Sequence, residues 1–304
     1  MSLVKDKAHY ERLMRQVALA AVLTAIFLAV LKTVAFILTD SMAMLGSLAD
    51  SALDIIASFV NLLAVRHALT PADEDHRFGH AKAEPLAGLA QGAFIGGSAV
   101  FLAIESVRRL IDPQPIANGV VGLWVMVVSI VVTVILVAAQ RHVVRKTGSL
   151  AISADRAHYV SDILVNAGVI VGLLLASNLG WQAADPLMGL AIAALIANTA
   201  WHVFIQSYDQ LMDRELPDTA REEIKTILLS HPEIHALHDL RTRAAGTKSF
   251  IQVHIELDPA LSLYRAHQIS DEAEALLRKT YKDADILIHQ DVAGLEQPAA
   301  LAQN

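Results

Sequence analysis

Six long apolar segments limit the folds that this chain of 304 residues can adopt. Each segment is long enough to cross a bilayer as a helix, which takes about 20 predominantly apolar residues. The mean hydropathy of +0.45 also indicates an integral membrane protein. The segments are Val17–Leu38, Ser41–Val65, Pro85–Leu110, Val120–Ala139, Ala151–Ser177 and Ala183–Tyr208.

Basic residues indicate how these segments are oriented. Lys and Arg accumulate in the loops on the cytoplasmic side of a membrane. Here they fall mostly on one side, so we expect both termini in the cytoplasm. The polar N-terminal stretch reads as retained rather than as a signal peptide. One side carries Lys5, Lys7, Arg12, Arg15, Arg66, Arg77, Lys82, Arg141, Arg145 and Lys146, and the other carries Arg108 and Arg109.

The composition excludes several classes of site and partner. The chain has no cysteine, so disulfides and thiolate metal sites are ruled out. Any soft-metal chemistry has to come from histidine and carboxylate groups. The formal charge of -7 argues against a general nucleic-acid binder.

Two pairs of polar residues lie inside the apolar segments at matching spacing. Asp50 and Asp54 are four residues apart, and so are His158 and Asp162. On a helix this spacing places both members of a pair on one face, one turn apart. An aspartate at the bilayer centre costs roughly 2.5–3.5 kcal/mol, so these groups must pair, meet water or hold a cation. If the two helices lie side by side, four ligands converge.

Three carboxylates and one imidazole suit a borderline divalent cation, with Zn(II) the natural choice. The imidazole disfavours Mg(II) and Ca(II), which prefer oxygen ligands only. Cadmium, ferrous iron, cobalt and manganese stay open on ligand type. Because the ligands must lose their protons to bind metal, a site facing the cytoplasm loads metal, and a more acidic exterior releases it.

Three other interpretations of the paired residues remain. The paired residues could form a buried polar network whose only role is to join two helices, although three carboxylates in one membrane site would repel one another. An intramembrane metalloenzyme would carry a general base near its metal, and no His-Glu-x-x-His motif occurs in the apolar segments. A metal-sensing receptor would bind metal without moving it across the membrane.

Two further features of the apolar segments are less specific. Gly88, Gly92 and Gly96 form a stripe of small residues that predicts close approach of another helix. Lys32 is a charged residue in the first segment, and its long stem could reach either the membrane interface or a polar cavity.

The loop between the second and third segments contains a second group of metal-ligand types. Asp73, His76 and His80 lie in a short, charged stretch. Their spacing allows a metal site in a tight turn, and it equally allows a solvated loop with a few titratable residues.

Beyond Tyr208 the pattern changes to that of a small α+β domain. Ser249–Asp258 alternates between apolar and polar residues, which is typical of a strand with one buried face. The predicted order is α-β-β-α-β, and His254 and His289 meet if their strands are neighbours. The predicted elements are helices Ala220–Leu229 and Leu263–Thr280 and strands Leu237–Arg243, Ser249–Asp258 and Ala284–Gln290.

We therefore predict three parts of the chain. Residues 1–212 form a six-helix transmembrane domain, residues 213–292 form a cytoplasmic α+β domain, and residues 293–304 form a disordered tail.

With these residues identified, the chain resembles the cation diffusion facilitator family, and within it the bacterial zinc exporters. The resemblance covers about residues 15 to 292, and the motifs occur in the same order. They are Asp50-Ser-Ala-Leu-Asp54, Pro71-Ala-Asp73-Glu-Asp-His76-Arg-Phe-Gly-His80-Ala-Lys82-Ala-Glu84, Ala154-Asp155-Arg-Ala-His158-Tyr-Val-Ser-Asp162, His238-Asp-Leu-Arg-Thr-Arg243 and Ile288-His289-Gln290-Asp291.

The resemblance implies a homodimeric antiporter of the bacterial inner membrane, not an enzyme. It would export Zn(II), and alternatively Fe(II) or Cd(II), in exchange for protons by alternating access. The transport site would be Asp50, Asp54, His158 and Asp162, with a second metal site at Asp73, His76 and His80. The cytoplasmic domain would be metallochaperone-like, with a binuclear site that joins the two domains of the dimer. Its ligands would be His238, His254, His267, His289, Gln290 and Asp291, and Lys82 and Asp213 would form a charge interlock at the membrane surface.

Overall fold

The computed structural model describes residues 2–39, 42–112, 120–179 and 183–294. The chain divides into two compact units, Met1–Tyr208 and Asp209–Asn304. The predicted boundary at residues 212 and 213 stays a prediction. Of the predicted disordered tail, residues 295–304 lie outside the described residues, as does Ser41 at the start of the second predicted segment.

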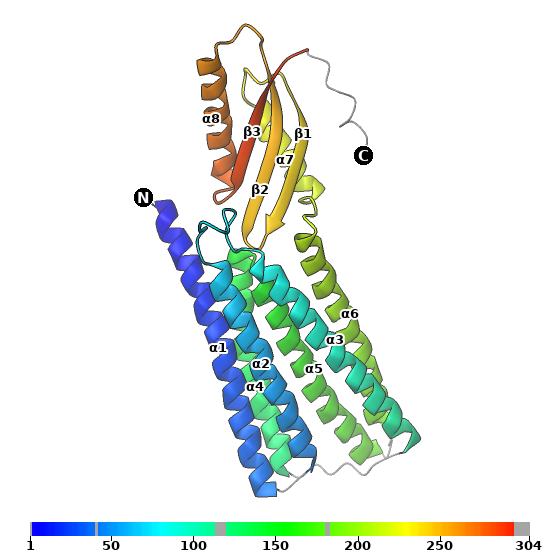
Figure 1. Ribbon diagram of the computed structural model, residues 1–304. Helices are drawn as coiled ribbons and strands as arrows, with labels where there is room; N and C mark the ends of the chain where they lie inside the picture. Colours follow the sequence, from blue (N-terminus) through cyan, green and yellow to red (C-terminus); the bar gives the residue numbers. More distant parts are fainter. Residues whose placement is uncertain (1, 40–41, 113–119, 180–182, 295–304) are drawn as a thin grey trace. The chain divides into compact units, whose positions relative to one another are not determined.

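The first unit consists of long helices (Figure 1). Five of the described helices are long and apolar enough to cross a membrane. The sixth predicted span, α5, is 30 residues long, but its first half carries Asp155, Arg156 and Asp162. The helices are α1 (Ser2–Thr39), α2 (Met42–Ala68), α3 (Ala83–Ile111), α4 (Val120–Thr147), α5 (Leu150–Leu179) and α6 (Ala184–Leu211).

The helices of this unit pack through small residues and one tyrosine. Helix α1 lies against α2 and α4, and α5 lies against α3 and α4. Tyr159 of α5 is 1% exposed; its hydroxyl donates to the carbonyl of Ala21 at 3.0 Å and lies 2.8 Å from Ser58 Oγ. One buried side chain therefore joins α5 to both α1 and α2.

The outer faces of these helices are apolar. Ile37, Phe101 and Trp124 are 73%, 65% and 64% exposed. Large uncovered apolar surfaces are uncommon on soluble monomers and are typical of a membrane or protein contact. Together with the length of the helices, this surface fits a bundle surrounded by lipid.

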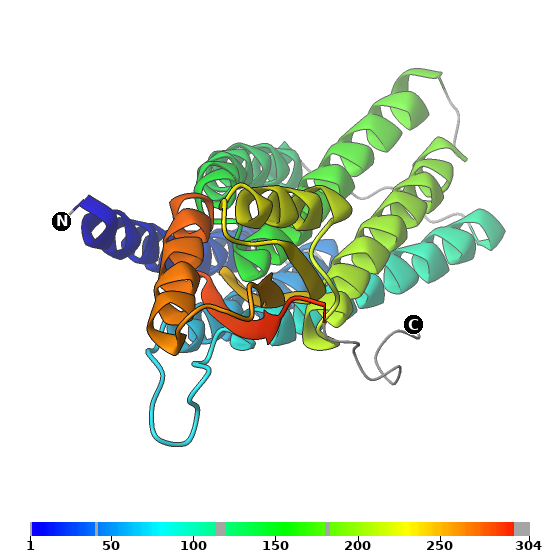
Figure 2. The ribbon, with the colours of Figure 1, turned by 90° about the horizontal axis from the view of Figure 1, so that it is seen from above.

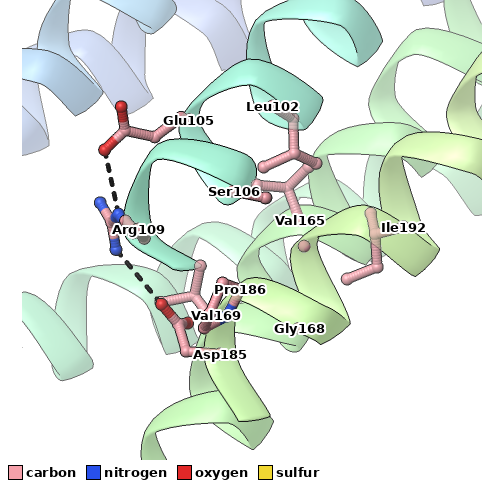
Figure 3. Close-up of a pocket in the computed structure, with 11 residues that line it drawn as sticks. Leu102, Glu105, Ser106, Arg109, Val165, Gly168, Val169, Asp185, Pro186 and Ile192 are labelled. Carbon is pink, nitrogen blue, oxygen red and sulfur yellow. Dashed lines mark hydrogen bonds and ion pairs between the residues drawn. The ribbon is translucent and has the colours of Figure 1, made fainter. Parts of the chain in front are cut away.

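The predicted glycine stripe is confirmed as a helix contact. A Cβ atom added at Gly88 would lie 2.2 Å from Ser207 Oγ of α6, and one at Gly92 would lie 3.4 Å from the backbone nitrogen of Phe204. Near the other end of the same contact, Arg109 of α3 pairs with Asp185 of α6 at 3.2 Å and with Glu105 at 3.0 Å, beside a cavity of about 90 Å³ (Figure 3). Close backbone approach and an ion pair thus hold α3 against α6.

The second unit has the predicted order α-β-β-α-β. Strands β1 and β2 are antiparallel, and β2 and β3 are parallel because α8 provides the crossover between them. Both helices pack against the same face of the sheet, as the view in Figure 2 shows. The elements are α7 (Asp218–Leu229), β1 (Ala236–Ala245), β2 (Lys248–Leu257), α8 (Leu263–Thr280) and β3 (Asp285–Val292).

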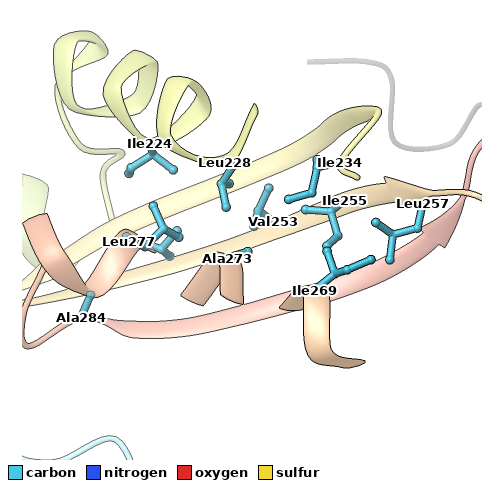
Figure 4. Packing of buried hydrophobic residues seen from close by; sticks show 11 residues of the cluster. Ile224, Leu228, Ile234, Val253, Ile255, Leu257, Ile269, Ala273, Leu277 and Ala284 are labelled. Atoms are coloured by element: carbon cyan, nitrogen blue, oxygen red, sulfur yellow. The ribbon is translucent and has the colours of Figure 1, made fainter. Parts of the chain in front are cut away.

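The core of this unit follows from the alternation in β2. Ile251, Val253 and Ile255 point to the helical side and are at most 1% exposed. Leu228 of α7 and Leu277 of α8 are fully buried against them (Figure 4). The opposite face of the sheet is left for polar side chains.

We expect Leu277→Ala to lower the unfolding free energy of residues 209–304 by about 2–5 kcal/mol, because it leaves a cavity in this core. Urea denaturation of that fragment measures the change. Leu263→Ala is the matched control, since Leu263 lies on the same helix but is 82% exposed; it should change the free energy by less than about 0.5 kcal/mol. Equal effects of the two substitutions would contradict the assigned core.

Candidate metal centres

Three groups of ligand-type side chains converge in the described residues. In each group the ligand atoms lie within 4.8 Å of one another. The groups are Asp54, His158 and Asp162; Asp73, His76 and His80; and His238, His254 and Asp291.

The first group lies between α2 and α5, as the matching spacings predict. His158 Nε2 lies 3.0 Å from Asp54 Oδ1 and 3.9 Å from Asp162 Oδ2. The His158 side chain is 7% exposed, whereas those of Asp54 and Asp162 are 17% and 32% exposed. The imidazole is thus buried between two carboxylates. The carboxylates are themselves more exposed, so a cation could reach their oxygen atoms. This arrangement can hold either a proton or a divalent cation at Nε2.

Asp50 lies outside this group. It is an exposed residue one turn before Asp54 on α2. Lys32 of the neighbouring helix α1 contacts the residues on either side of Asp50 along α2. Its Nζ atom donates to Ser51 Oγ at 2.6 Å and to the Ser47 carbonyl at 3.2 Å. Of the two expectations for Lys32, the structure supports the polar interior, since the residue is 8% exposed.

The sequence reasoning missed two buried carboxylates of the helical unit. Asp155 and Glu84 are each 1% exposed. Glu84 of α3 accepts from Ser149 Oγ at 2.6 Å and from the backbone N–H of Ala151 at 3.3 Å, which holds the start of α5. For Asp155 the available signal was its position inside the predicted span Ala151–Ser177, because an intramembrane carboxylate needs a partner; Glu84 lies one residue before the predicted third span.

The loop group forms around one aspartate. Asp73 Oδ1 lies 3.1 Å from His76 Nδ1, and Asp73 Oδ2 lies 3.3 Å from His80 Nε2. The backbone N–H of His76 donates to Asp73 at 2.6 Å and, with the neighbouring imidazole, holds the pKa of that carboxyl below its usual value. An ionised carboxylate between two imidazoles is a suitable start for a metal site.

His67, which the sequence reasoning also missed, supports the loop group. It lies in the last turn of α2, and its ring meets that of His80 edge-on with 4.5 Å between centroids. The His80 side chain is 4% exposed. Its Nδ1 atom is buried without a hydrogen-bond partner among the described residues.

The third group belongs to a row of side chains across the sheet, called the sheet row below, which consists of His238, His254, His289 and Asp291. His238, His254 and His289 are partners on β1, β2 and β3, so their side chains project from the same face. Asp291 Oδ2 lies 2.8 Å from His254 Nδ1 and 3.1 Å from His238 Nε2, and Asp291 Oδ1 lies 3.3 Å from His289 Nε2. The row occupies the face opposite the hydrophobic core.

Two carboxylates tune this row. Partial burial alone would raise the pKa of Asp291, but the hydrogen bond with His254 and the nearby imidazoles bring that pKa below its usual value. Glu256 Oε1 lies 3.2 Å from His238 Nδ1, which leaves Nε2 of that ring facing Asp291. Orientation of a ligating imidazole through its other nitrogen is common in metal sites.

Two predicted ligands are not brought to this group within the chain. His267 lies on α8, where its exposed ring is 3.6 Å from Asp271. Gln290 points to the helical face and donates to Ser270 Oγ at 2.8 Å, because it alternates with His289 and Asp291 along β3. Their ligand roles stay predictions. The interlock of Lys82 with Asp213 also stays a prediction, because the two residues belong to different units. Within its own unit, Asp213 accepts a hydrogen bond from Arg243 at 3.0 Å.

Comparison with known proteins decides the family. Residues 18–212 match the cation efflux transmembrane domain, and residues 216–293 match the cytoplasmic domain of cation efflux proteins. The chain belongs to the cation efflux family. This assignment confirms the resemblance and the transmembrane architecture, and it makes the protein a membrane transporter of cations rather than an enzyme.

Individual relatives agree with the family assignment. The cation-efflux pump FieF of Pectobacterium atrosepticum is 45% identical over 283 residues, covering 93% of this chain and 94% of its own. FieF of Shewanella oneidensis is 43% identical over 289 residues, covering 95% and 97%. The metal-bound C-terminal domain of the CzcD transporter from Thermotoga maritima is 29% identical, with a TM-score of 0.25, covering 27% of this chain and all of that domain.

For this cation efflux protein, we expect His254→Ala to weaken Zn(II) binding to the full chain at the sheet row at least about tenfold, because it removes a ligand that already contacts Asp291. Isothermal titration calorimetry measures the affinity. His235→Ala is the matched control, since His235 is exposed and lies outside the three groups. Equal affinity of both variants would rule out the row as a metal site.

Proposed function

We propose that this cation efflux protein is a divalent cation/proton antiporter that exports Zn(II) from the cytoplasm by alternating access. The observation that carries the proposal is the convergence of Asp54, His158 and Asp162 inside the helical unit. Asp50, one turn away on α2, is the fourth proposed ligand.

The ligand types support Zn(II) as the cargo. One imidazole nitrogen and up to three carboxylate oxygens suit a four-coordinate borderline cation. His158 Nε2 lies between the two carboxylates, 3.0 Å from Asp54 and 3.9 Å from Asp162, so a cation held by both carboxylates also meets the imidazole nitrogen. Fe(II) and Cd(II) are alternative cargoes for the same ligands.

The geometry of His158 supports proton coupling. A proton on Nε2 is donated to Asp54 across the 3.0 Å contact. A cation that binds through the same nitrogen and oxygen has to displace that proton. Metal and proton therefore compete for the same two atoms, and exchange between them needs no separate coupling device.

We further propose that both termini lie in the cytoplasm of a bacterial inner membrane and that the protein works as a homodimer. The loop group and the sheet row would then both face the cytoplasmic metal pool. His267, His289 and Gln290 would join His238, His254 and Asp291 in a binuclear site across the dimer. The metal-bound CzcD domain supports a metal role for this part of the chain.

Asp54→Ala should abolish Zn(II) flux, because it removes both a ligand and the proton acceptor of His158. The measurement is Zn(II) uptake into proteoliposomes under an imposed pH gradient, with internal pH followed in parallel. Zn(II) binding at the sheet row should persist. Asp218→Ala is the matched control, since the Asp218 side chain is 88% exposed on α7 and lies outside the three ligand groups; it should keep native flux. Retained flux in Asp54→Ala would refute the assigned transport site.

His158→Asp should loosen discrimination against Mn(II), because an all-oxygen ligand set suits that cation. We expect the ratio of Mn(II) to Zn(II) flux to rise at least about tenfold, which corresponds to about 1.4 kcal/mol. The same proteoliposomes, loaded with each metal in turn, give the ratio, and Cd(II) is run beside them. An unchanged ratio would show that the ligand types do not act as the filter.

A further inference from the structure

One histidine beside the loop group has no part in the proposed function. His67 lies in the last turn of α2, and its ring meets the ring of His80 edge-on with 4.5 Å between the centroids. The ring of His76 also lies 4.5 Å from that of His80. Three imidazoles therefore gather around the position of His80, and the loop group described above uses two of them.

The loop group has fewer ligands than Zn(II) takes in a structural site. Asp73, His76 and His80 supply one carboxylate oxygen and two imidazole nitrogens. Zinc in structural sites is almost always four-coordinate, so one position is left for another ligand. Water fills that position in an open site, whereas a fourth side chain fills it in a closed site. The kind of site thus depends on whether another donor of the chain can reach the ion.

His67 is a donor that can fill this position. Its side chain is exposed, and within the part of the chain that the structure describes no hydrogen bond occupies its ring nitrogens. These nitrogens are not among the ligand atoms that lie within 4.8 Å of one another, so ligation requires a rotation of the side chain. Exposed side chains change rotamer within nanoseconds, and this rotation starts from a ring that already contacts one ligand of the group.

A buried atom of His80 shows that the surroundings of this ligand are incomplete. The His80 side chain is 4% exposed, and its Nε2 atom lies 3.3 Å from Asp73. Its Nδ1 atom is buried and has no hydrogen-bond partner among the described residues. A buried polar atom left without a partner costs about 1–3 kcal/mol. This cost indicates that the polar groups around His80, with His67 among them, rearrange when an ion binds.

We propose that His67 is the fourth ligand of the loop group, so that three imidazoles and one carboxylate hold Zn(II) there in a closed site. The inference rests on the proposed metal role of the loop group and adds both the ligand and the kind of site. His67 belongs to α2, whereas the other three ligands belong to the loop that follows it. The ion therefore ties the end of the helix to the loop, and it has a structural role because a closed shell leaves no open position.

The competing explanation is that His67 only packs against His80 or accepts a hydrogen bond from its Nδ1 atom. Two substitutions of equal size separate these roles. His67→Gln can still pack and accept that hydrogen bond, but its neutral amide is a poor ligand for zinc. His67→Glu has the same shape and supplies a carboxylate oxygen, which zinc binds. A ligand position tolerates the second change and not the first, whereas a packing position treats both alike.

The test measures the Zn(II) affinity of the loop group by isothermal titration calorimetry on the full chain in detergent. Asp54→Ala and His254→Ala remove ligands of the other two groups, and adding Asp73→Ala identifies the signal of the loop group by its loss. In the first background we expect His67→Gln to weaken binding at least about tenfold, and His67→Glu to weaken it less than about threefold. His142→Gln, at an exposed position of α4, is the matched control and should keep the affinity. Unchanged affinity in His67→Gln, or equal losses in His67→Gln and His67→Glu, would overturn the fourth ligand.

A second control separates ligation from added negative charge. Thr70 is exposed and follows His67 by three residues. Combining His67→Gln with Thr70→Glu therefore places the same charge near the group from another position. We expect this combination to keep the weakened affinity, and recovery of the native affinity would overturn ligation by His67.

The binding measurement also keeps this inference apart from the antiporter proposal. Binding in detergent requires no transport, so a chain that moves no Zn(II) refutes the antiporter while the test of His67 still stands. If Asp73→Ala removes no binding, the loop group is not a metal site, and the fourth ligand is overturned with it.

Discussion

The cost of holding charge inside a helical bundle organises the first unit. An ionised carboxylate away from water is stable only if it is paired and hydrogen-bonded. Asp54 lies against His158, Asp155 accepts from two glutamines, and Glu84 accepts from Ser149 and the start of α5. Each pairing joins two or more helices, so the polar groups also determine how the helices are aligned.

Helix α5 is the element on which most of these pairings meet. His158 and Asp162 face α2, while Asp155 reaches α3 and α4 through amide groups. Tyr159 adds the contact with α1. A helix with so many polar side chains in its first half is stable in the bundle because its neighbours satisfy those groups. The features that weaken its signal as a membrane span are therefore the features that build the site.

Local patterns predicted the parts of the chain that depend on one element at a time. The spacing of Asp50 and Asp54 placed two carboxylates on one face, and the alternation in β2 predicted which face of that strand is buried. Partners on other helices carry no such signal, so the glutamines that hold Asp155 could not be read from the sequence. The row of His238, His254 and His289 depends on strand register, which only the folded sheet defines. Gln290 shows the same limit, because a shift of one residue along β3 moves a side chain to the other face.

The three ligand groups share one arrangement, in which a carboxylate oxygen lies within hydrogen-bond distance of an imidazole nitrogen. Ligation through such a pair displaces the shared proton, so metal and proton compete in all three. Asp73 is exposed and Asp291 is only partly buried, so protons there exchange directly with the surrounding water. In the proposed antiporter, exchange at His158, which is buried between helices, depends on which side of the bundle is open. Under that proposal, the same chemistry drives vectorial transport only at the site that the helices enclose.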